Sequence, residues 1–90
     1  MALAERKVEI VNSLGLHARP SAEFVKLASQ FRSEVFLTKD EMQVNGKSIM
    51  GVMTLAAECG SHLTIRTEGE DAEAALEALA ALVAKGFSEV

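Results

Sequence analysis

Hydrophobic and polar residues alternate near the start of the chain and then change to a helical repeat. Residues 5–12 present charged and apolar side chains in turn, which predicts a half-buried strand. The apolar residues of 18–31 recur every three or four positions, which predicts a helix with one buried face. Pro20 fits a helix that begins here, because a first-turn proline removes only an amide without an intrahelical acceptor.

The next third of the chain predicts a hairpin followed by a short helix. Strands are expected at 34–39 and 42–45, joined by a tight polar turn. Ser48 is a favourable N-cap, so the short helix is expected to begin there and to run through Leu55-Ala56.

The last third predicts one more strand and a long helix. Alternation resumes from His62 to Thr67, and Asp71 is expected to cap an alanine-rich helix that ends at Lys85-Gly86. The element order is therefore βαββαβα. This order predicts an α+β fold in which helices cover one face of an antiparallel or mixed four-stranded sheet.

Composition places the whole chain, residues 1–90, in one domain. Hydrophobic residues make up 49% of it, which is too many for a disordered segment. The net charge is −4, most of it in the second half, and neither Trp nor Tyr is present. A chain with no clustered basic face and few aromatic rings is not expected to bind nucleic acid.

The cysteine content and the hydropathy indicate a cytoplasmic domain. Cys59 is the sole cysteine, so no internal disulfide is expected. The charged N-terminus lacks the apolar core of a signal peptide, and no apolar run is long enough for membrane insertion. Cys59 and His62 supply two of the four ligands that a structural zinc ion needs, so no metal site is expected.

The segment around His17 has the features of an anion site. His17 stands where a loop becomes a helix, so the unpaired amides of the first turn, beginning at Ala18, can face an anion beside its ring. Arg19 adds a fork of donors, and Gly15 lets the backbone approach closely. A neutral imidazole is also a competent nucleophile toward phosphorus. The alternative is that His17 only caps the helix and Arg19 is a solvated charge.

Two segments resemble motifs of one bacterial family. The first begins at Gly15 and reads GLHARPSAEFV. It resembles the active-site signature of HPr, the histidine-containing phosphocarrier of the phosphoenolpyruvate-dependent sugar phosphotransferase system. The second, Asn45 to Met53, reads NGKSIMGVM and resembles that family's regulatory-serine motif. Length and element order also agree, so the resemblance covers essentially the whole chain.

The resemblance implies a fold, a role and partners. The fold is an open-faced sandwich, a four-stranded antiparallel sheet with three helices on one face. His17 would take phosphate on Nδ1 from enzyme I and donate it to enzyme IIA, and Arg19 would steady the phosphoryl group. Gly15 and Ala18 would belong to the active-site loop and helix start. Ser48 would be modified by an HPr serine kinase/phosphorylase. The chain would be a monomeric, transferase-associated carrier without cofactor, not an enzyme.

Apolar residues beside these motifs predict a docking surface. Ile49, Met50 and Met53 exceed what so short a helix can bury, and methionines adapt to several partners. Together with Leu16 they are expected to contact partner proteins. A phosphate on Ser48 would then weaken docking by placing charge in an apolar contact. The alternative is that Ser48 only caps the helix and the methionines only pack.

Two other functions compete with the sugar-transport carrier. One is a nitrogen-branch, regulatory paralogue that uses the same histidine chemistry. The intact NGKSIMGVM segment favours the sugar branch, whereas Lys85-Gly86-Phe87 favours the nitrogen branch. The other is a small α+β module that binds RNA or a small ligand without phosphotransfer. A basic or aromatic sheet face would favour that module, and the sequence predicts neither.

Overall fold

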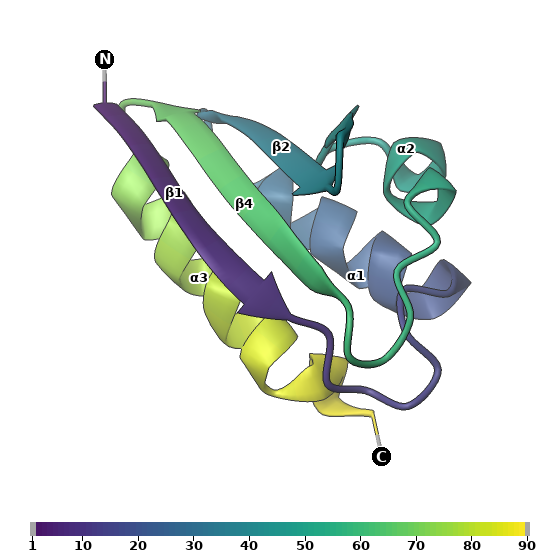
Figure 1. Cartoon of the computed structure of the whole chain (residues 1–90). Helices are drawn as coiled ribbons and strands as arrows, with labels where there is room; N and C mark the ends of the chain where they lie inside the picture. The colour runs from purple at the N-terminus through teal and green to yellow at the C-terminus, as the bar shows by residue number, and fades with distance from the viewer. Residues whose placement is uncertain (1, 90) are drawn as a thin grey trace.

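A four-stranded sheet and three α-helices make up the chain in the computed structural model, which describes residues 2–89 (Figure 1). The element order is the expected βαββαβα, followed by one short 3-10 turn. The elements are β1 (Ala2–Glu9), α1 (Ala18–Ala28), β2 (Glu34–Lys39), β3 (Met42–Asn45), α2 (Ile49–Thr54), β4 (His62–Gly69), α3 (Ala72–Ala84) and the 3-10 turn η1 (Gly86–Ser88).

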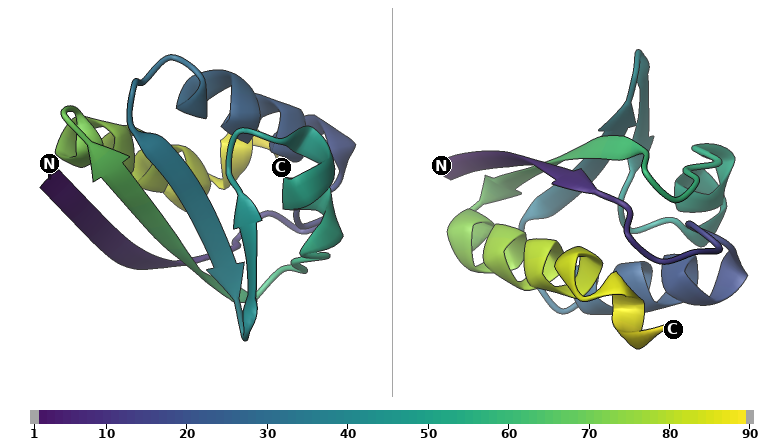
Figure 2. Two further views of the ribbon diagram at one scale, coloured as in Figure 1. Left: turned by 90° about the horizontal axis from the view of Figure 1, so that it is seen from above. Right: turned by 60° about the horizontal axis from the view of Figure 1, so that its bottom comes forward.

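The sheet is antiparallel throughout and has the strand order β1-β4-β2-β3. The first strand therefore pairs with the last one, and β4 lies between β1 and β2. Helices α1 and α3 lie side by side on one face, α2 packs on α1 beside them, and the opposite face of the sheet is open (Figure 2). This confirms the open-faced α+β sandwich.

The core lies between the sheet and the two long helices. On β4 the inward positions Leu63, Ile65 and Thr67 are almost fully buried, in strict alternation with exposed or half-buried ones. Phe24 of α1 and Leu79 of α3 close this layer from the helical side. Each such fully buried apolar side chain contributes roughly 1.5–3 kcal/mol, so this layer fixes how the helices sit under the sheet.

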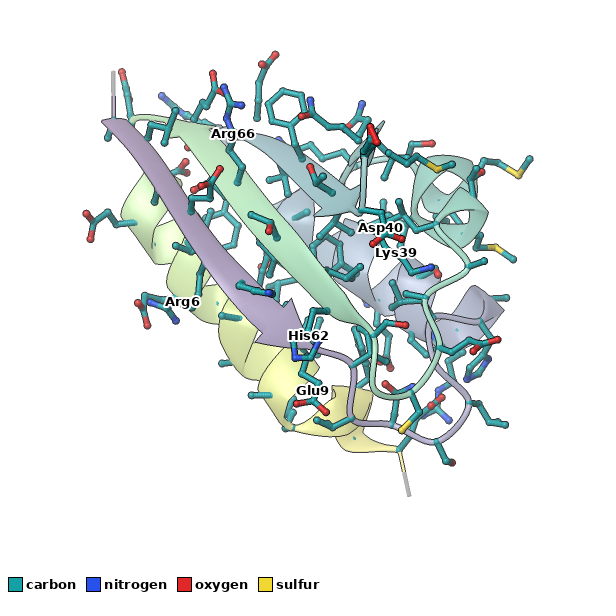
Figure 3. All side chains as sticks on the ribbon, in the orientation of Figure 1. Arg6, Glu9, Lys39, Asp40, His62 and Arg66 are labelled. Carbon is teal, nitrogen blue, oxygen red and sulfur yellow. The ribbon has the colours of Figure 1, made fainter. Side chains whose placement is uncertain are left out.

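The open face of the sheet carries charged and polar side chains instead. Figure 3 shows His62 and Glu9 together where β4 begins and β1 ends, and Arg66 farther along β4. The guanidinium of Arg66 lies 5.8 Å from the centre of the Phe36 ring, a cation–π contact. Acidic side chains lie beside the bases, Glu9 by His62 and Glu68 by Arg66, so the described strands present no clustered basic patch on this face.

Two predicted elements differ from the structure by three residues. The first strand was expected at 5–12 but spans 2–9, because its N-terminal residues pair with the end of β4, where Ala2 lies opposite Gly69. Helix α1 was expected to reach residue 31 but ends at Ala28. The amides of residues 30 and 31 donate to carbonyls only three residues back, a 3-10 pattern that ends the α-helix.

Asp71 does not cap α3 with its side chain, contrary to expectation. Its carboxylate instead accepts hydrogen bonds from the amides of Arg32 and Ser33, each at 2.9 Å, and from the Ser33 hydroxyl. These bonds, led by the one from the hydroxyl, lower the pKa of Asp71 to about 2. Asp71 therefore ties the segment before β2 to the start of α3.

Candidate functional site

His17 occupies the N-cap position of α1. Its carbonyl accepts the first intrahelical bond, from the Ser21 amide at 3.1 Å, but its side chain makes no capping hydrogen bond. The ring is therefore not used as a cap, and its side chain is 37% exposed. The amides of Ala18 and Arg19 have no intrahelical acceptor, because they belong to the first turn. This arrangement suits an anion held beside the ring.

The loop before His17 is held rigidly from two sides. Gly15 has a left-handed backbone, φ +68°, and a Cβ there would overlap the carbonyl oxygen of Ala57. The same oxygen accepts the Leu16 amide at 2.9 Å. From the other side, the buried Ser21 hydroxyl donates to the Leu16 carbonyl at 3.1 Å. The segment after α2 and the first turn of α1 thus fix the position of His17.

One ring nitrogen of His17 is already engaged. Its Nε2 lies 2.8 Å from a carboxylate oxygen of Glu89, near the end of the described chain. Because a carboxylate only accepts, Nε2 carries a proton in this contact, and in the neutral ring Nδ1 therefore keeps its lone pair. The second carboxylate oxygen of Glu89 accepts from Nδ2 of Asn12 at 3.0 Å, and the same Nδ2 donates to the Gly15 carbonyl at 2.8 Å.

Sequence reasoning missed Asn12 and Glu89. Both lie outside the periodic segments, and Glu89 is separated from Asn12 and His17 by 77 and 72 positions. One available signal was the apolar Phe87 directly after the Gly86 break, which indicates that the chain turns back onto the core. Nothing in the pattern indicated which loop the following carboxylate would reach.

Arg19 is exposed in the first turn of α1 and lies beside a carboxylate of the same helix. Its Nε lies 3.9 Å from a carboxylate oxygen of Glu23, one turn along α1, and its side chain is 68% exposed. An ion pair so open to water contributes little, so it does not hold the guanidinium firmly. Its role beside a phosphoryl group stays a prediction.

Ser48 caps α2 as predicted, and its hydroxyl accepts the Gly51 amide at 3.1 Å. Three apolar residues of α2 are exposed: Ile49 by 43%, Met50 by 78% and Met53 by 40%. Leu16 was expected among them, and this is wrong. It is 5% exposed and packs in the core, because the bonds around its backbone turn it inward.

Cys59 and His62 do not form a shared site. The Sγ of Cys59 lies 3.8 Å from the Val11 carbonyl, whereas His62 pairs with Glu9 at 3.9 Å. Among residues 2–89, no three His, Cys, Asp or Glu side chains gather where they could hold a metal ion. Within the same residues, no helix is long and apolar enough to cross a membrane.

Comparison with known proteins decides the family. A family model described as the PTS HPr component phosphorylation site matches residues 4–85. The chain belongs to the HPr family. Phosphocarrier protein HPr of Neisseria meningitidis is 48% identical over 87 residues, which are 97% of this chain and 98% of that protein.

Solved HPr structures agree in fold. An HPr crystal structure from Thermoanaerobacter tengcongensis matches with a TM-score of 0.93 at 45% identity, over 97% of this chain and 98% of that one. Crh of Bacillus subtilis, a catabolite repression protein described as a dimer with a swapping domain, matches with a TM-score of 0.76. Its identity is 51%, over 90% of this chain and 93% of the Crh chain.

Membership in the HPr family settles the class of function. The chain is a phosphocarrier of the phosphotransferase system and not an enzyme, and the family's partners include enzyme I and enzyme IIA. A binding module without phosphotransfer is thereby set aside.

Proposed function

We propose that this single-domain chain accepts a phosphoryl group from enzyme I on Nδ1 of His17 and donates it to an enzyme IIA domain. The observation that carries this proposal is the contact between His17 Nε2 and Glu89, which leaves Nδ1 as the nitrogen with a lone pair. The exposed ring at the start of α1 supports it, because a donor protein can reach that nitrogen.

The chemistry needs positioning more than a special group. The lone pair of Nδ1 attacks phosphorus while the bond from phosphorus to enzyme I breaks, and the electron pair of that bond stays with the donor atom. The first-turn amides and the positive end of α1 stabilise the charge on the equatorial oxygens. Gly15 leaves the loop without a side chain at the bend just before the histidine.

Phosphorylation with phosphoenolpyruvate and a cognate enzyme I tests the proposal. Mass spectrometry under non-acidic conditions should place one phosphate on His17. A His17→Ala variant should take up none, whereas His62→Ala, which removes the other histidine, should be labelled like the wild type. Circular dichroism checks that the His17→Ala variant is folded. Labelling of this variant equal to that of the wild type would refute the assignment.

We further propose that Ser48 is a regulatory phosphorylation site inside a docking surface made of Ile49, Met50 and Met53. Support comes from the exposure of these apolar side chains around a serine at the helix start. An ATP-dependent HPr kinase/phosphorylase should label the wild type and not Ser48→Ala. The serine-phosphorylated protein should then accept phosphate from enzyme I more slowly, since charge enters an apolar contact.

The sugar branch is the proposed pathway, and the NGKSIMGVM segment supports it over the nitrogen branch. Rates of transfer to a sugar-type and a nitrogen-type IIA domain, measured side by side, decide between the branches.

We also propose a transferase-associated, cytoplasmic monomer. Size-exclusion chromatography with light scattering tests the monomer, and the swapped Crh dimer makes this test worthwhile.

A further inference from the structure

We infer that Glu89, itself held by Asn12, is a positioning residue for phosphoryl transfer. It holds the Nε2 proton of His17, so that Nδ1 stays unprotonated, and it balances the positive charge that the ring gains on phosphorylation. This inference rests on the proposed role of His17 as the phosphoryl acceptor. Its structural half, the fixed tautomer, can be tested without any phosphotransfer.

Residues 86–89, which follow α3, are fixed to the core and bring Glu89 to His17. Gly86, with φ +63°, ends α3, and Phe87, with φ +57°, inserts its 1% exposed side chain into the core. The Glu89 amide donates to the Gly86 carbonyl at 3.0 Å, which closes the turn. Figures 1 and 2 show this turn beside the loop that joins β1 to α1. The Glu89 side chain is 11% exposed, so it is held in place and is not a solvated tail residue.

Asn12 fixes the carboxylate from the other side. Its side chain is 3% exposed, and its Nδ2 serves two acceptors, the Gly15 carbonyl and Glu89. Turning the amide round would set its oxygen against both of these oxygens, so its orientation is determined. Within residues 2–89, the buried Oδ1 of Asn12 has no hydrogen-bond partner. A buried acceptor without a partner is unfavourable, which indicates that this amide is placed for its donor group.

The charge balance of the reaction explains why a carboxylate is useful here. When the bond from Nδ1 to phosphorus forms, the bond from phosphorus to enzyme I breaks and its electron pair returns to the donor atom. The Nε2 proton of His17 stays, so the ring becomes a phosphoimidazolium with a positive charge. Glu89, 2.8 Å from Nε2, opposes that charge. Because the same transition state is crossed in both directions, stabilising it should speed both acceptance from a given donor and return to that donor.

The identity of residue 89 matters because two donors converge on it. Each oxygen of the glutamate accepts one hydrogen bond, from Asn12 and from His17. A glutamine has one accepting oxygen and would present an N–H to one of these donors. Glu89→Gln therefore removes the charge and one contact while keeping the size of the side chain.

Nitrogen NMR of the unphosphorylated protein tests the positioning directly. At about pH 9, well above the ordinary histidine pKa, the wild-type His17 ring should carry its proton on Nε2 alone. In Glu89→Ala the ring should become a mixture of both tautomers. The matched control is Glu9→Ala, which removes the carboxylate beside His62 and should leave His17 unchanged. An unaltered His17 tautomer in Glu89→Ala, with the amide spectrum of the fold intact, would overturn the inference.

Rates of phosphorylation by enzyme I test the catalytic consequence. Glu89→Gln and Glu89→Ala should lower the maximal rate on the order of tenfold, as expected for one charge-assisted contact at a partly exposed site. The KM for the carrier should not change, because the docking surface is untouched, and the endpoint should still be one phosphate on His17. A wild-type rate in both variants would overturn the inference while leaving the function of His17 intact. A wild type that takes no label would instead refute the proposed function.

Discussion

At the scale of single residues, Gly15 is a position where a side chain is poorly tolerated. A Cβ there would meet both a left-handed φ and the Ala57 carbonyl oxygen. Gly15→Ala should therefore lower the free energy of unfolding by about 2 kcal/mol or more, because strain and steric overlap add. Urea denaturation followed by circular dichroism measures it.

Gly60 is the matched control for Gly15. It also has a positive φ, +92°, but no atom lies within 4 Å of the Cβ that an alanine would add. Gly60→Ala should cost only the backbone strain, about 1 kcal/mol. Equal losses in the two variants would show that contact with Ala57 does not constrain the histidine loop.

The cap at Ser48 gives a second residue-scale prediction. Ser48→Ala removes the acceptor for the Gly51 amide, so it should lower the free energy of unfolding by about 1 kcal/mol. Ser48→Asp keeps an acceptor and should retain most of that stability, while it adds charge to the docking surface. Urea midpoints of the three proteins measure the effect, and a Ser48→Ala midpoint equal to the wild type would show that the cap is dispensable.

Local motifs singled out His17 and Ser48 as candidate site residues, but not the residues that contact the His17 ring. The side chain of Leu16 was misplaced because apolar character alone does not distinguish a docking residue from a core residue. Asn12 and Glu89 were missed because their contact depends on where the tail after Gly86 comes to rest. That position is set by packing of Phe87 in the core, and an apolar residue after Gly86 does not indicate which loop the following carboxylate reaches.

At the scale of elements, Asp71 joins α3 to the segment before β2. Its lowered pKa, about 2 against 3.8 unperturbed, means that its bonds stabilise the fold fully above about pH 4 and are lost as the pH falls toward 2. Asp71→Asn should lower the urea midpoint at pH 7, and the difference from the wild type should shrink between pH 4 and pH 2. A difference independent of pH would show that the charge of Asp71 is not what stabilises the contact.

The elements themselves were largely predictable, and their ends were not. Periodicity, alternation, turn and capping signals located the four strands and three α-helices of residues 2–89, whereas the 3-10 turn after α3 was not predicted. The start of β1 was missed because Ala2, Leu3 and Ala4 do not alternate, and only their pairing with β4 makes them a strand. Likewise Asp71 looked like a cap because its partners lie in a loop far away in the sequence.

At the scale of the whole molecule, three exposed apolar side chains lie together on α2, which packs on α1. Met50 is 78% exposed, so Met50→Glu should change the free energy of unfolding by less than about 0.5 kcal/mol. It should nevertheless raise the KM for phosphorylation by enzyme I about tenfold, because a charge enters an apolar contact.

Leu3 is the matched control for Met50. It is 57% exposed on β1, outside the docking surface, so Leu3→Glu should leave the phosphorylation kinetics unchanged. Similar KM values for both variants would show that α2 is not part of the contact with enzyme I.

The pairing of β1 with β4 also has a consequence for the order in which the chain acquires its shape during synthesis. The strand made first, Ala2–Glu9, has its hydrogen-bonding partner at His62–Gly69. At ribosomal speeds of about 5–20 residues per second, it waits on the order of seconds for that partner. The β2–β3 hairpin can form meanwhile. The loop that carries His17 directly follows β1, so it stays unanchored on that side until β1 pairs with β4. His17 is therefore translated well before β4, and its loop is set in place only after that strand has paired with β1.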